Sequence, residues 1–430
     1  MSTTAIAWLI AYVGGALMSF YHPIYGLLAY FLTYYQLPRL RWWGKKALPQ
    51  LRWSFMISLV LLGSFFLRRR SLSPLSVKTH PQTKWLMLLI ANAFFVSATL
   101  AVWKEKSWEN TIEILKYGIL YLMIISTVRT KEHFYYTIYM HIFGIFSWGW
   151  AAFMNPKRKA GRLYGIGGPD SLHDNSTSSI FVAILPFIAS TFLTGTKWVK
   201  LASSGAAAFA LNGFILCNSR GGMIALAMEA LMALKVSKGP MRRNVFLMMI
   251  AGGLLFLFLV DPTFIERQKV GEDYGEDRSA TSRLDAWKGA IDLVRDHPLG
   301  VGGGGFVRLS PIYIPHIVEA HGGAGRNVHS TYFLVLSEYG IQGFIFYMGF
   351  VLSTFYELSS IRKNTPQTEE GRKIWVHSLA ITLGFLGILT AGAFTSRLMA
   401  ETPYWLAAFA AVLKNLQVIE SEKTTELAQA

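Results

Sequence analysis

The chain alternates between long apolar runs and short polar or basic connections. A helix needs about 20 apolar residues to cross a bilayer, and these runs lack the alternation over about ten residues that is typical of a transmembrane β-strand. The pattern therefore predicts an all-α polytopic membrane protein with about 12 transmembrane helices. The predicted spans lie at residues 5–20, 24–36, 52–67, 85–102, 112–127, 134–153, 178–193, 199–217, 221–235, 244–260, 330–356, 374–395 and 404–417. Residues 24–36 are short for a span, so a re-entrant or interfacial helix is the alternative there.

Composition supports this class of protein. Hydrophobic residues make up 52% of the 430 and charged residues only 15%, whereas soluble domains carry about a quarter. The net charge of +16 comes from short clusters beside apolar runs, which indicates membrane topology rather than nucleic-acid binding. The single cysteine, Cys217, excludes an internal disulfide and a cysteine-based metal site. The first apolar run lacks a basic flank and a cleavage signal, which favours a retained helix.

Basic loops set the expected orientation, because short loops rich in Lys and Arg stay in the cytoplasm. Clusters near residues 68–70, 129–131, 235–243 and 362–373 are therefore placed inside. The segment 262–328 then forms one large periplasmic loop between N-terminal helices (1–261) and C-terminal helices (329–418), all within a single membrane domain. Residues 419–430 are a cytoplasmic tail that we expect to be disordered.

One stretch contradicts this orientation. Between residues 39 and 52 the chain carries five cations and no acid, yet alternation puts it outside. Either the early topology is misread or these cations face an anionic lipid or ligand. The cations are Arg39, Arg41, Lys45, Lys46 and Arg52.

Arg220 lies at a turn. The apolar run 199–235 is about twice the length of one span, so it must reverse at Asn218-Ser219-Arg220-Gly221-Gly222. Two interpretations stay open. The guanidinium contacts lipid headgroups from the membrane boundary, or it clamps a phosphate as a bidentate fork.

The large loop offers a second arginine. Leu284, Trp287, Ile291 and Val294 recur at helical spacing and predict an amphipathic helix that ends near Asp296. With Thr281 or Ser282 as N-cap, Arg283 falls in the first turn, where the helix dipole disfavours a cation unless an anion binds there. A solvated arginine balanced by a nearby aspartate is the alternative.

Two further features are ambiguous by themselves. The glycine run at 300–305 lacks the Lys-Ser/Thr ending of a nucleotide-binding loop and predicts either close backbone packing or an anion nest. Residues 165–177 combine glycines, Asp174 and upstream cations on the same face as Arg220, and they also suit an N-cap.

His329 directly precedes a predicted helix at the outer membrane boundary. A histidine there can take a proton from an attacking hydroxyl because its ordinary pKa lies near neutral pH. A purely structural histidine is the alternative. His297, His316 and His321 match no zinc spacing, and we predict no metal and no cofactor.

These motifs, taken in order, resemble the O-antigen ligase family of bacterial envelope glycosyltransferases. The resemblance rests on Ser219-Arg220-Gly221-Gly222, Arg283 with Trp287, residues 297–302 and His329, and it covers roughly residues 160–345. The N-terminal part is more faintly similar to O-glycosylation ligases that accompany exosortase systems. Many relatives carry Asn where this chain has Ser330, which leaves the acceptor open.

The resemblance implies a GT-C-like, metal-independent enzyme of the bacterial inner membrane that acts at the periplasmic face. It would transfer a glycan from undecaprenyl diphosphate to a hydroxyl acceptor such as lipid A-core, in lipopolysaccharide or surface polysaccharide assembly. By position, Arg220 and Arg283 would bind the donor diphosphate and His329 would be catalytic. Arg278, Arg326 and Asp174 are accessory candidates.

Three other functions remain open at this stage. An O-antigen polymerase shares the donor, and a protein O-oligosaccharyltransferase would use a Ser or Thr acceptor. A lipid-linked sugar transporter would bind the same diphosphate without chemistry. The concentration of polar residues at one face, with no internal repeat, favours an enzyme over a transporter.

Overall fold

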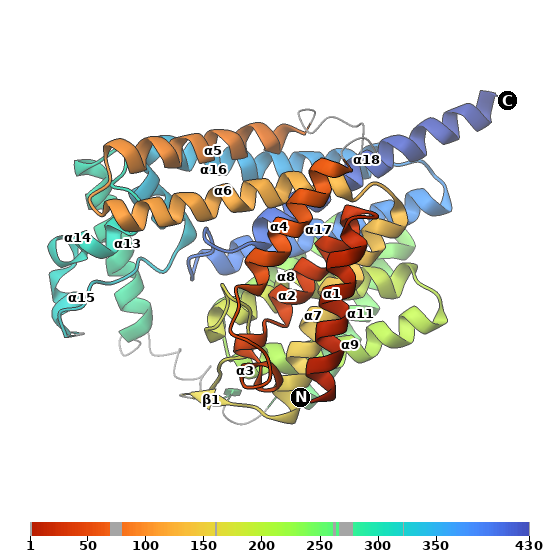
Figure 1. Ribbon diagram of the computed structural model, residues 1–430, viewed down its shortest axis with the longest axis horizontal. Helices are drawn as coiled ribbons and strands as arrows, with labels where there is room; N and C mark the ends of the chain where they lie inside the picture. The colour runs from red at the N-terminus through yellow and green to blue at the C-terminus, as the bar shows by residue number, and fades with distance from the viewer. Residues whose placement is uncertain are drawn as a thin grey trace.

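The computed structural model describes residues 2–68, 80–159, 161–260, 264–265, 278–320 and 322–429, and their side chains except at 278–280 and 427–429. Helices dominate this part of the chain (Figure 1). The long helices of the bundle are α1 (Thr3–Ser19), α2 (Pro23–Tyr35), α4 (Trp53–Leu67), α5 (Pro81–Thr99), α6 (Lys104–Thr127), α7 (Lys131–Met154), α8 (Asp174–Thr194), α9 (Lys197–Cys217), α10 (Arg220–Val236), α11 (Gly239–Leu259), α16 (Thr331–Asn364), α17 (Glu369–Gly392) and α18 (Thr402–Gln429).

The shorter elements lie in the connections. They are the 3₁₀ turn η1 (Pro38–Leu40), α3 (Trp42–Lys45), the antiparallel strands β1 (Arg158–Lys159) and β2 (Arg162–Leu163), α14 (Gly305–Tyr313) and α15 (Pro315–Ala320). A longer helix, α13 (Arg278–Asp296), precedes α14. In Figure 1, α13, α14 and α15 gather at one end of the layer formed by α5, α6 and α16.

Every predicted apolar segment coincides with a helix, which confirms the all-helical class. Among the described residues, five helices are by themselves long and apolar enough to cross a membrane, namely α8, α9, α11, α16 and α17. The other helices of the bundle do not meet this criterion of length and composition by themselves, so the predicted number of about 12 spans stays a prediction. Many carry apolar side chains on their outer surface, for example Ile10 and Leu17 of α1, which are both 67% exposed.

The core surrounds α18, whose residues 402–413 are all buried. Around it, α17 packs on α8 and α10, and α16 packs on α5. By contrast, α11 has no buried residue and contacts only the neighbouring helices α9 and α10 extensively. The N-terminal helices form a second, smaller core around Trp8, Trp43 and Trp53.

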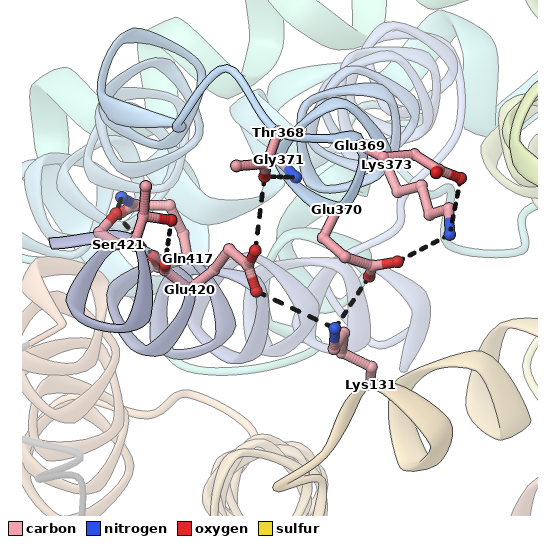
Figure 2. Close-up of polar contacts among 10 residues, drawn as sticks. Lys131, Thr368, Glu369, Glu370, Gly371, Lys373, Gln417, Glu420 and Ser421 are labelled. Carbon is pink, nitrogen blue, oxygen red and sulfur yellow. Dashed lines mark hydrogen bonds and ion pairs between the residues drawn. The ribbon is translucent and has the colours of Figure 1, made fainter. Parts of the chain in front are cut away.

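A polar network joins three helices at the end of the bundle away from Arg220 (Figure 2). The ammonium of Lys131, in α7, lies 3.0 Å from Glu370 of α17 and 4.0 Å from Glu420 of α18. Thr368 caps α17 by accepting from the Gly371 amide, and it also donates to Glu420 over 3.4 Å. These groups are partly exposed, so each pair contributes at most about 1 kcal/mol, and the network mainly fixes the ends of the helices.

Two expectations from the sequence are corrected. The tail is not disordered over residues 420–429, since α18 continues to Gln429. Ser282 is not an N-cap, because α13 already begins at Arg278 and Arg283 lies beyond its first turn.

Candidate active site

Three arginines line one small pocket at the end of the bundle. Arg220 comes from α10, Arg283 from α13 and Arg162 from β2, so segments from three distant parts of the chain meet there. The other lining residues are Asn175, Ser219, Gly221, Gly222, Ala391, Phe394 and Thr395. The pocket therefore concentrates positive charge against a mostly small and neutral wall. We call this end of the bundle the site face.

Arg220 is held by a tight reversal between α9 and α10. Asn218 adopts the left-handed conformation (φ 49°) that ends α9, and Ser219 is the N-cap of α10, accepting from the Gly222 amide at 3.2 Å. The Ser219 hydroxyl also donates to Asn175 of α8 at 2.8 Å. Ser219, Arg220, Gly221 and Gly222 all line the pocket, so the positive end of the α10 dipole lies at its wall.

Arg283 reaches the pocket because α13 docks on the bundle. The indole of Trp287 stacks on Phe333 of α16, with ring centroids 5.3 Å apart and planes 21° from parallel. Ala286 and Ala290 are buried on the same face of α13. A helix is thus confirmed in this loop, but the predicted apolar face is only partly correct. The face that packs on the bundle carries Ala286, Trp287 and Ala290, whereas Leu284 and Ile291 are 53% and 40% exposed.

Arg162 is oriented by Asp174. The Arg162 guanidinium forms an ion pair with the Asp174 carboxylate in the first turn of α8, and both side chains are less than a quarter exposed. The next residue, Asn175, lines the pocket. Asp174 therefore does not line the pocket itself, but it binds Arg162 and directly precedes Asn175, which both line it.

His329 lies beside the pocket but is not among the residues that line it. Its backbone has φ 51°, a left-handed conformation that is uncommon for a residue with a side chain, and its amide is held by Asn327 at 3.3 Å. Partial burial lowers the pKa of His329 to about 4, and the nearby Arg283 and Arg326 guanidiniums act in the same direction. The residue is partly exposed, and the two cations favour the neutral form of its ring.

The start of α16 is tied to the pocket wall. The Thr331 hydroxyl donates to the Thr395 carbonyl at 3.2 Å and accepts from the Arg397 amide at 2.8 Å. The buried Arg397 guanidinium in turn donates to the carbonyls of Asp170 and Ser176. His329 is therefore anchored to the same wall that the arginines face.

The glycine run has a structural role. Gly300, Gly302 and Gly304 have φ values of 93°, 84° and 77°, and a Cβ on Gly300 would lie 2.6 Å from the Gly340 nitrogen. The Gly302 amide donates to the Glu338 carbonyl at 2.8 Å, and the Gly303 amide donates to the Ser107 hydroxyl at 2.9 Å. The structure supports close backbone packing, at the point where Gly340 kinks α16, and the amides of Gly304 and Phe306 also donate to the Glu338 carboxyl.

The remaining predicted residues are placed less directly. Arg326 lies close enough to His329 to influence its charge, and its own amide donates to the Ser310 hydroxyl at 2.8 Å. The side chain of Arg278 and residue His321 lie outside the described residues. His316 lies 3.4 Å from Asp285 and is not among the residues that line the arginine pocket.

A large apolar cavity follows α10 away from the arginines. It has a volume of about 620 Å³ and lies between α8, α9, α10, α11 and α17. Met223, Leu226, Ala230 and Ala233 line it from α10 at helical spacing, so one helix joins the charged pocket at its start to the apolar cavity along its length. The buried carboxyl of Glu229 also lies on the cavity wall.

Sequence reasoning missed Arg162, Asn175 and Thr395 as members of the site. Arg162 lies between α7 and α8, Asn175 lies in the first turn of α8, and Thr395 follows α17. Their proximity to Arg220 therefore depends on the packing of α8 against α10 and α17. One signal was present, since the cations upstream of Asp174 were placed on the same face as Arg220.

A comparison with protein families identifies the central part of the chain. Residues 205–348 match the family model described as O-antigen ligase, and the match contains Arg220, Arg283 and His329. No curated protein sequence matches the chain. The predicted family resemblance is thereby confirmed over residues 205–348, which are similar to a family of ligase-type and polymerase-type membrane enzymes of surface polysaccharide assembly.

Proposed function

We propose that the protein transfers a glycan from undecaprenyl diphosphate to a hydroxyl acceptor such as lipid A-core, at the periplasmic face of the bacterial inner membrane. The observation that carries this proposal is the arginine pocket, in which Arg162, Arg220 and Arg283 meet at the start of α10. An anionic headgroup with a long apolar tail matches a charged pocket followed by an apolar cavity on the same helix.

The arginines suit a diphosphate leaving group. A guanidinium offers paired N–H donors in a plane, which fit two phosphate oxygens better than an ammonium does. Charge grows on the diphosphate as its bond to the sugar breaks, and fixed cations in a confined pocket stabilise that charge without reorganising. Three guanidiniums and the dipole of α10 supply this stabilisation, so the proposed transfer needs no divalent cation.

His329 acts as the general base in this proposal. The acceptor hydroxyl oxygen bonds to the anomeric carbon, the bond from that carbon to the diphosphate oxygen breaks, and the electron pair leaves with the diphosphate. His329 takes the hydroxyl proton and later returns it to water. Because its pKa is lowered to about 4, the ring is neutral and able to accept a proton at pH 7.

The apolar cavity holds the polyprenyl tail. Its lining is almost entirely aliphatic and aromatic, and α11, the helix with no buried residue, forms one wall. A lipid chain entering from the bilayer displaces only this loosely packed helix. The tail then positions the diphosphate by extending along α10 toward Arg220.

The test compares hosts that lack the gene with hosts that carry wild type or His329→Gln, matched for membrane expression. Surface polysaccharide is separated on gels, and lipid-linked glycan is extracted in parallel. The proposal expects loss of long-chain lipopolysaccharide, polymer accumulating on undecaprenyl diphosphate, and rescue by wild type only. Lipopolysaccharide capped by single repeats would instead identify a polymerase, and an unchanged ladder would turn attention to a protein acceptor or to transport.

A further inference from the structure

A strongly basic surface lies beside the arginine pocket. Residues 36–53 and 155–163 together contain nine cations and no acidic residue. Arg41 is buried and Arg162 is paired with Asp174, which leaves seven exposed cations. We call this set the basic surface: Arg39, Lys45, Lys46, Arg52, Lys157, Arg158 and Lys159.

Arg41 fixes the position of the first segment. Its side chain is 8% exposed, and it donates to the Ile166 carbonyl at 2.6 Å and to the Tyr35 carbonyl at 2.5 Å. Ile166 follows the β1–β2 hairpin, so residues 36–53 lie on the site face next to the hairpin, as α3 and β1 do in Figure 1. The first segment and the arginine pocket therefore lie at the same end of the bundle.

The basic surface lies where apolar helices end. One side of α1 exposes Ile6, Ile10, Val13 and Leu17 at helical spacing, which is the pattern of a lipid-facing stripe. The other side of α1 packs on α3, with the rings of Trp8 and Trp43 5.8 Å apart. The cations of α3 therefore lie close to the start of α1, at the level where a membrane meets water.

Exposed apolar side chains lie between the cations. Trp42 is 78% exposed and Leu51 is 45% exposed, although each has cations nearby in sequence. Tryptophan is enriched at membrane interfaces, where its ring sits among headgroups. A site for a soluble polyanion does not account for these two side chains, whereas an interface with anionic lipid accounts for both them and the cations.

The location of the charge is also unusual. Cations in short loops normally remain on the cytoplasmic side, and this chain has such a cluster on the opposite face at Lys235, Lys238, Arg242 and Arg243. Seven further exposed cations on the site face oppose that tendency. Anionic headgroups in the adjacent leaflet would neutralise them.

We infer that the basic surface binds the phosphate headgroups of anionic lipids in the leaflet on the site face, with Trp42 inserted among them. This contact anchors the N-terminal helices, whose small core is separate from the main one. Each Lys or Arg close to the membrane surface increases the preference for anionic over neutral lipid by about fivefold. The inference is independent of the proposed transfer reaction.

The test uses the full chain in nanodiscs of phosphatidylcholine that contain a minor fraction of either dibrominated phosphatidylglycerol or dibrominated phosphatidylcholine. Bromine quenches tryptophan fluorescence at contact, and the difference between wild type and Trp42→Phe isolates the signal of Trp42. We expect the phosphatidylglycerol form to quench this signal at least fivefold more at low salt, with the preference falling at high salt. Equal quenching by the two lipids would overturn the inference.

Matched charge variants locate the effect. The preference should disappear in the fourfold variant Arg39→Gln, Lys45→Gln, Lys46→Gln, Arg52→Gln. It should persist in the control Lys235→Gln, Lys238→Gln, Arg242→Gln, Arg243→Gln, which loses the same charge from the opposite face. Persistence in the first variant, or binding of a soluble acidic polysaccharide in place of the lipid, would refute the assignment. Circular dichroism and gel filtration confirm that all variants are folded.

Discussion

Substitution of Gly222 by alanine tests whether the close approach of α8 and α10 positions Arg220. A Cβ on Gly222 would lie 2.1 Å from the Ser178 hydroxyl oxygen, 3.1 Å from Phe214 Cε2 and 3.3 Å from Ser178 Cβ. Ordinary contact begins near 3.4 Å, so about 1.3 Å of movement is needed at this turn, shared between the Ser178 side chain and α10. Gly222 lies two residues from Arg220, and the shift therefore moves the guanidinium relative to Arg162 and Asn175.

The expected effect is larger on activity than on stability. Overpacking costs about 1–3 kcal/mol, and the gain in helix propensity returns at most about 1 kcal/mol. A misplacement of about 1 Å at a catalytic group lowers turnover by up to about 100-fold. We therefore expect Gly222→Ala to melt a few degrees lower in detergent and to transfer glycan at least tenfold more slowly than wild type.

Two comparisons make the test specific. Gly205→Ala, in the middle of α9, places its Cβ where nothing lies within 4 Å, and it should retain full activity. Ser178→Ala removes the colliding oxygen, which has no hydrogen-bond partner among the described residues, so it should be tolerated alone and should restore much of the activity to Gly222→Ala. Wild-type activity of the single Gly222→Ala variant would refute the argument, as would the absence of any rescue.

Three other predictions follow from the site. Arg220→Lys should reduce transfer by about 10-fold to 100-fold at unchanged expression, since an ammonium in place of a bidentate fork loses about 1.4–2.8 kcal/mol of transition-state stabilisation. Activity within twofold of wild type would exclude a fork contact. As pH falls, kcat/KM should decrease only near pH 4, where His329 of the free enzyme is protonated, and Arg326→Gln should move this decrease to higher pH because a cation that disfavours protonation is removed. A decrease near pH 6.5 in wild type would contradict the assigned base. Ala230→Phe should fill part of the apolar cavity and raise KM for a long-chain polyprenyl donor but not for a short-chain analogue. An equal effect on the two donors would mean that the tail binds elsewhere.

The sequence was sufficient where the argument is local. The apolar run 199–235 is too long for one span, so a reversal had to occur, and the structure places it between Cys217 and Arg220 as expected. The spacing of apolar residues in the loop likewise predicted α13, although not its start. Run length and periodicity depend on neighbours along the chain, which is why these elements could be predicted.

The sequence was insufficient where the site depends on contacts between distant segments. The sequence near Arg162 indicates only that it lies on the same face as Arg220. That it lines one pocket with Arg220 and Arg283 depends on the packing of α8 against both α10 and α17. The glycine run at 300–305 could equally have bound an anion. Only its hydrogen bonds to Glu338 and Ser107 show that it packs against other helices.

The first turn of α8 connects the two halves of the proposed chemistry. On one side, Asp174 holds Arg162 and Asn175 accepts from Ser219, which caps the helix that carries Arg220. On the other side, the Ser176 carbonyl accepts from Arg397, whose amide donates to the threonine that follows Ser330 at the start of α16. Arg162, the start of α10 and the start of α16 are thus attached to one short segment through hydrogen bonds and an ion pair. A displacement of this turn therefore moves the start of α10 and the start of α16 together. Motions of the large loop change the distance between these two helix starts less than they change the position of Arg283.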